Sequence, residues 1–129
     1  MNEHEMGFLA FIQPRQQRRL RTLLELGKKR RGDVLALLDH AIELDPKTVV
    51  ALPGGDQFPP IVEKKLRSLG APNNCYVIGP ADLDGRTMPL ADALVEIIGS
   101  GRGAFVSCLP GTLGYYEYEH ASGGQILCR

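Results

Sequence analysis

The chain has 129 residues and a formal net charge of zero, and 43% of its residues are hydrophobic and 23% are charged. These values are typical of one soluble globular domain with a core large enough to fold without covalent cross-links. No stretch approaches the roughly 20 apolar residues of a membrane span, and three cysteines without a close pair exclude a disulfide framework, so we expect a cytoplasmic protein without membrane association.

The N-terminal third predicts a short arm followed by two helices. Residues 1–13 predict an extended arm or a short strand. Leucines recur at helical spacing over 15–26, with Pro14 placed to open a helix and Gly27 placed to end it. A second apolar stripe predicts a helix over 33–45. We expect the two helices to pack as an antiparallel hairpin, and the alternative is a single long helix through Gly27.

The expected hairpin carries most of the positive charge of the chain. Between Ile12 and Arg31, eight basic residues and one acid give +7, whereas from Gly32 to Arg129 seven basic and twelve acidic residues give −5. Such a block favours an anionic partner, either nucleic acid or an acidic protein surface, including that of a second copy. The alternative is a solvated helix face. The candidate contact residues are Arg15, Arg18, Arg19, Lys28, Lys29, Arg30 and Arg31.

The middle of the chain predicts strands that alternate with helices, because short apolar runs are separated by stretches of helical periodicity. The expected elements are a strand over 48–52, a turn over 53–56, a helix over 59–69, a strand over 75–78, a polar loop over 79–86 and a helix capped by Thr87 that ends at Gly99.

The last thirty residues predict a β-meander with strands over 103–109, 113–119 and 125–128. In the middle strand, tyrosines alternate with glutamates, so we expect one packed face and one solvated face. The last strand would lie at a sheet edge and pair with that of a second copy, which predicts a dimer.

Together these elements predict an α+β or α/β fold in one domain over residues 1–129. We expect a single mixed sheet of about five strands that ends in the antiparallel meander. The helix hairpin and two further helices would cover this sheet.

One string resembles a catalytic motif. The stretch from Asp82 to Thr87 is similar to the first motif of haloacid dehalogenase-type phosphatases, in which the first aspartate attacks phosphorus and the second is the general acid beside Mg²⁺. Asp82 and Asp84 would take these roles. The stretch departs from the motif because Arg86 displaces the threonine, and no lysine follows Lys65. The alternative is a polar loop whose aspartates form turns.

Cys108 is the other candidate catalytic side chain. At the end of a strand it could be a nucleophile if His40 or His120 supplied a base, although a free cysteine is more often a small buried hydrophobe. The histidines are isolated from one another and from the cysteines, so we expect no metal and no other cofactor.

The C-terminal stretch 105–119 follows the pattern FxSCxPGxLxYxExE. With the segments 69–72, 75–78 and 83–90, it resembles a group of small bacterial proteins of unassigned role. The resemblance spans residues 15–129 and implies a bacterial cytoplasmic protein, and it brings no activity or site residues.

We therefore expect a non-enzymatic binding or regulatory module that self-associates or docks an anionic partner through the basic hairpin. The alternative is a small hydrolase or transferase that uses Cys108, or Asp82 with Asp84.

Overall fold

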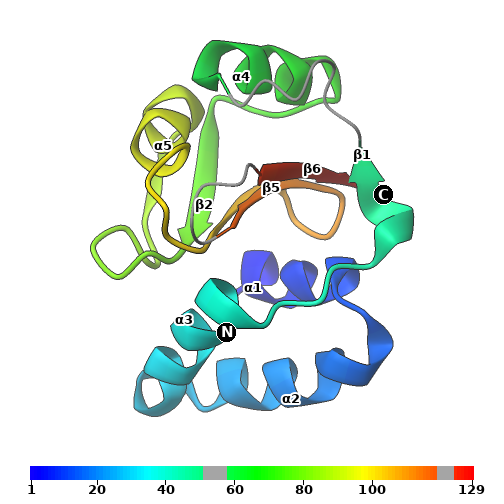
Figure 1. Cartoon of the computed structure of the whole chain (residues 1–129), viewed down its shortest axis with the longest axis vertical. Coiled ribbons are helices and arrows are strands. Elements are labelled where there is room, and N and C mark those ends of the chain that lie inside the picture. The colour runs from blue at the N-terminus through cyan, green and yellow to red at the C-terminus, as the bar shows by residue number, and fades with distance from the viewer. Residues whose placement is uncertain (51–57, 119–123) are drawn as a thin grey trace.

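The computed structural model of the chain describes residues 1–50, 58–118 and 124–129, and it places one β-sheet between two layers of helices (Figure 1). The strand order is β1-β6-β5-β4-β2-β3, and each pair of neighbours is antiparallel. The strands are β1 (Val49–Val50), β2 (Asn74–Ile78), β3 (Thr87–Pro89), β4 (Ala104–Leu109), β5 (Leu113–Glu117) and β6 (Gly124–Cys128). The predicted α+β class with a single helix-covered sheet is confirmed, with six strands in the described parts of the chain rather than about five. The prediction of a mixed sheet is wrong, because every strand pair in these parts is antiparallel.

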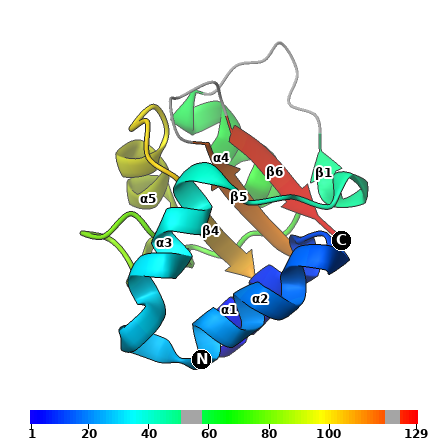
Figure 2. The ribbon, with the colours of Figure 1, turned by 60° about the horizontal axis from the view of Figure 1, so that its bottom comes forward.

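The helices are α1 (Glu3–Phe8), α2 (Pro14–Glu25), α3 (Arg31–His40), α4 (Pro59–Ser68) and α5 (Leu90–Ile97), and the 3-10 turns are η1 (Leu9–Phe11), η2 (Gly27–Arg30) and η3 (Pro46–Thr48). Helices α1, α2 and α3 pack on one face of the sheet, and α4 and α5 pack on the other (Figure 1). The chain breaks at Gly27, as predicted, and α2 and α3 diverge from η2 (Figure 2). In the parts of the chain that the structure describes, no helix combines the length and apolar character needed to cross a bilayer.

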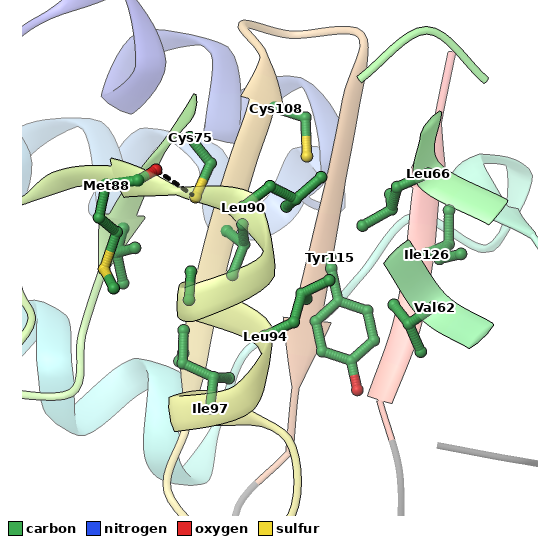
Figure 3. Packing of buried hydrophobic residues seen from close by; sticks show 14 of the residues in the cluster. Val62, Leu66, Cys75, Met88, Leu90, Leu94, Ile97, Cys108, Tyr115 and Ile126 are labelled. Atoms are coloured by element: carbon green, nitrogen blue, oxygen red, sulfur yellow. Dashed lines mark hydrogen bonds between the residues drawn. The ribbon is translucent and has the colours of Figure 1, made fainter. Parts of the chain in front are cut away.

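Helices cover both faces of the sheet, and successive side chains of a strand point to opposite faces, so neighbouring strand residues are buried in different helix layers. In β2, Cys75 and Val77 face α4 and α5, whereas Tyr76 and Ile78 face the N-terminal helices. On the first face, Leu66 of α4 and the apolar side of α5 surround Tyr115 of β5 (Figure 3). Each helix layer therefore closes its own apolar core.

The first residues do not form the expected arm or strand. Residues 3–8 form α1, which Asn2 caps by accepting a hydrogen bond from the Glu5 backbone nitrogen at 2.9 Å. The apolar run that follows is buried, and the Phe8 ring stacks on Phe105 of β4 with 4.3 Å between ring centroids. These residues form a helix because they pack against the sheet. The spacing of apolar residues along the sequence gives no information about that packing.

Three details of the C-terminal half also differ. Thr87 does not cap α5, because residues 87–89 pair with β2 as the edge strand β3 and the N-cap of α5 is Pro89. Glu117 was expected on a solvated face but is 1% exposed. Strand β6 is flanked by β1 and β5, so the predicted dimer contact through its edge is already occupied by Val49 and Val50. The predicted turn at 53–56 and the ends of the predicted strands at 51–52 and 119 lie outside the described residues.

Candidate functional site

The basic block occupies the outer side of α2 and the turn η2. Leu20, Leu23 and Leu24 bury one side of α2 against the sheet, which leaves the polar positions of this amphipathic helix exposed. Gly27 then adopts a φ of +63°, which a glycine tolerates without strain, and the chain turns through η2. Lys28 and Lys29 follow in this exposed turn.

Two of the predicted contact residues form ion pairs with carboxylates of the same chain that are at least partly exposed. Arg15 pairs with Glu43, and Arg30 pairs with Asp33 at 3.1 Å, one turn further along α3. Exposed pairs of this kind are weak and exchange readily with solvent or with another partner. Both arginines therefore remain on the surface, but their charge is partly compensated within the chain.

Arg31 differs from the other predicted contact residues, because its guanidinium is bound by two carboxylates of the same chain. Its side chain is 20% exposed, and it donates to Asp84 through Nε at 2.7 Å and through Nη2 at 3.0 Å. Nη2 also donates to Glu5 at 2.9 Å. Burial alone would lower the pKa of the guanidinium, but these hydrogen bonds and the two carboxylate charges raise it above its ordinary value, so Arg31 stays charged.

The remaining cations form what we call the basic surface, namely Arg18, Arg19, Arg21, Lys28 and Lys29. All five side chains are exposed, and none forms a salt bridge within residues 1–50, 58–118 and 124–129. Arg21 was not among the predicted contact residues, although it belongs to the same charge block and the same helix. Only Arg15, Arg18 and Arg19 of this helix were predicted as contact residues, and Arg21, which directly follows the buried Leu20, was left out.

The two aspartates of the phosphatase-like stretch serve different parts of the fold. Asp84 binds Arg31 and also accepts a hydrogen bond from the Gly79 backbone nitrogen at 2.8 Å. Asp82 lies on the surface and accepts from Arg102 at 2.9 Å, and this hydrogen bond lowers the pKa of Asp82. The pair does not converge on a common point, and the described part of the chain holds no cluster of His, Cys, Asp or Glu suited to a metal ion.

Cys108 is a core residue and not an exposed nucleophile. Its side chain is 3% exposed on the face covered by α4 and α5, close to Cys75 (Figure 3). Burial raises the pKa of the Cys108 thiol to about 12, which keeps it protonated at neutral pH. His40 lies on α3, across the sheet from Cys108, and His120 is outside the described residues. Among the described residues, no base forms a hydrogen bond with this thiol that could activate it as a nucleophile.

A polar cluster under α1 was missed by the sequence analysis. His4 Nδ1 lies 2.7 Å from Ser107 Oγ, and the His4 ring stacks on Tyr76 with 5.3 Å between centroids. The Tyr76 hydroxyl donates to Glu5, the same carboxylate that binds Arg31. Ser107 is 1% exposed, so a substrate cannot reach its hydroxyl. This cluster fixes α1 on the sheet, and it could not be foreseen once residues 1–13 were expected to be extended.

The fold and the site define an α+β sandwich of helices around one antiparallel sheet, with a basic external surface on its N-terminal helix layer. Comparison of the chain with protein-family models, with curated proteins and with solved structures gives no match.

Proposed function

We propose that this chain is a non-enzymatic binding module whose basic surface docks on the phosphate backbone of a duplex nucleic acid. The observation that carries the proposal is an imbalance in ion pairing. The five cations of the basic surface have no carboxylate partner among the described residues, whereas most carboxylates of the chain already bind donors of their own chain.

The pairing of the carboxylates supports an external polyanion as the partner, in preference to an acidic face of a second copy. Of those described after Gly32, only Asp92 and Glu96 lack a partner in the described residues. The others accept hydrogen bonds or ion pairs within the chain, namely Asp33, Asp39, Glu43, Asp45, Glu63, Asp82, Asp84 and Glu117. In this part of the chain, a second copy therefore offers few carboxylates that do not already accept a hydrogen bond.

The composition of the surface favours the backbone of a duplex over single-stranded bases. Residues 14–31 contain no aromatic side chain on which bases could stack. Exposed arginines and lysines on a helix and its following turn suit phosphate contacts, which position a protein without reading sequence. We also propose a cytoplasmic location, which the three free cysteines support.

The test is the affinity of the chain for a fluorescent DNA duplex of mixed sequence, measured by anisotropy over a salt series. We expect log K to fall linearly with log salt, with a slope that shrinks by about 0.9 for each phosphate-contacting cation removed. The decisive variant replaces Arg18, Arg19 and Arg21 by glutamine and should lose most of the binding.

The control replaces Lys64 and Lys65 by glutamine and is compared per charge removed, because it removes two positive charges and the arginine variant removes three. These residues lie on α4, in the opposite helix layer, so their loss removes charge without touching the basic surface. Binding that is absent at low salt would refute the proposal. An equal loss of affinity per charge removed in the α4 control would show that net charge, and not this surface, attracts the duplex. A salt-sensitive dimer in sedimentation experiments without duplex binding would favour a second copy instead.

A further inference from the structure

The turn that carries Lys28 and Lys29 has little apolar packing to hold it in place. None of the four residues of η2 is buried. A cavity of about 230 Å³ lies where Gly27 and Lys28 approach Glu5 of α1 and Asp84. The position of this turn therefore depends on the residues at its two ends.

Before the turn, Leu24 is buried in the core. After the turn, Arg31 is held by ion pairs with Asp84 and Glu5. The Arg31 guanidinium makes two hydrogen bonds to Asp84 and one to Glu5, two residues that come from distant segments of the chain. A planar guanidinium bound by both oxygens of a carboxylate is fixed in orientation as well as in position. The residue that follows η2 is thus rigidly placed.

The two carboxylates are themselves fixed. Asp84 accepts from the Gly79 backbone nitrogen at 2.8 Å, directly after β2. Glu5 accepts from the Tyr76 hydroxyl, which belongs to β2. The chain of contacts therefore runs from the central sheet through Asp84 and Glu5 to Arg31, and from Arg31 to the basic turn.

We propose that Asp84 is a positioning residue for the basic surface. Its carboxylate, together with that of Glu5, fixes Arg31 and thereby holds Lys28 and Lys29 in the orientation in which they meet a polyanion. This inference rests on the proposed function. It gives the second aspartate of the phosphatase-like stretch a role in binding that needs no catalysis.

The sign of the charge makes the inference testable. Replacing Asp84 by asparagine removes one negative charge near the basic surface, so electrostatics alone would tighten the binding of a polyanion. Loss of positioning would weaken it, because two long side chains would then have to be ordered on binding. The two explanations therefore predict opposite changes.

Asp82→Asn is the matched control. It makes the same change of charge two residues away, at an exposed side chain that contacts Arg102 and not Arg31. We expect Asp82→Asn to bind the DNA duplex as tightly as the wild type or slightly more tightly. Asp84→Asn should bind it more weakly, by roughly 2- to 10-fold.

Amide hydrogen exchange of residues 27–31, measured without DNA, tests positioning independently of the partner. Exchange should be faster in Asp84→Asn and unchanged in Asp82→Asn. Arg31→Lys keeps the charge but loses the bidentate contact with Asp84, so it should have the same effect as Asp84→Asn. It replaces Asp84→Asn in the experiment if that variant does not fold.

If Asp84→Asn exchanges like the wild type and binds as tightly as Asp82→Asn, the positioning role is wrong. If the wild type does not bind the duplex at all, the proposed function fails, and the exchange data still decide whether Asp84 orders the turn.

Discussion

Gly7 of α1 and Gly111 of the turn between β4 and β5 approach so closely that Gly7 has no room for a side chain. A β-carbon on Gly7 would lie 2.2 Å from the Gly111 backbone nitrogen and 2.8 Å from the Pro110 carbonyl carbon. Both neighbours are backbone atoms, which cannot rotate away as a side chain can. This contact seats α1 against the end of the sheet.

Gly7→Ala should therefore destabilise the fold by at least about 2 kcal/mol, because overpacking against backbone forces α1 to move. Gly32→Ala is the control, since Gly32 lies in α3 and a β-carbon there meets nothing within 4 Å. Alanine should stabilise that helix by about 0.5–1 kcal/mol. Urea unfolding measures both. Equal stability of the two variants would show that α1 does not rest on this turn.

The three thiols should differ in reactivity. Cys128 is partly exposed, whereas Cys75 and Cys108 are each 3% exposed, and burial raises the pKa of both to about 12. Because the thiolate is the reactive form, a disulfide reagent should titrate Cys128 in the native protein and the other two only after unfolding. Cys128→Ala should abolish the fast phase. A fast phase that persists in this variant would contradict the burial of the core thiols.

The same two thiols predict a loss of stability at alkaline pH. An exposed thiol has a pKa of about 8.5, so between about pH 9 and about pH 12 the unfolded chain releases protons that the folded chain retains. The free energy of unfolding is therefore not affected by these thiols below about pH 8. Above that pH it falls, by up to about 1.4 kcal/mol per pH unit for each thiol. Urea unfolding over this range measures the slope. Replacing Cys75 and Cys108 by alanine should reduce the slope.

Two arginines that both pair with aspartates should differ in their effect on stability. Arg31→Met leaves the carboxylates of Glu5 and Asp84 without their cation, and these side chains are only 9% and 14% exposed. We expect a loss of about 2–4 kcal/mol, since breaking a largely buried ion pair strands the remaining charges. Arg102→Met removes the surface contact with Asp82 and should cause no measurable loss. Thermal unfolding of the two variants at neutral pH compares them, and similar melting temperatures would mean that Arg31 is not an internal residue.

The elements that could be predicted from the sequence are those that local patterns specify. Helix α4 begins at Pro59 and buries Val62 and Leu66, as the spacing indicated, and β2 follows the apolar run that ends at Ile78. Strand β3 could not be predicted, because three residues become a strand only through pairing with β2. The apolar run before Ile12 suits a strand or a helix, and its contact with the sheet decides for α1.

The positive charge of the candidate site could be predicted from the sequence, but the pairing of its individual residues could not. Composition alone locates the basic block, yet it cannot tell which cations find a carboxylate in the fold. Arg31 and Asp84 are 53 positions apart, and no periodic pattern connects them. For the same reason, the contact of Asp84 with Arg31 could not be predicted. The phosphatase-like stretch around Asp84 indicated a catalytic role and gave no sign that this residue supports a turn.

The position of β6 inside the sheet has a consequence for biosynthesis. Val49 and Val50 of β1 pair with Leu127 and Ile126, so the ladder at this edge cannot close until residues 124–128 have left the ribosome. Until then β5 also lacks its neighbour on that side, and a hydrophobic strand edge stays open on the nascent polypeptide. Such an edge can bind chaperones or pair with other chains and aggregate. We therefore expect the open edge to affect the yield of folded protein during synthesis more than it affects the stability of the finished fold.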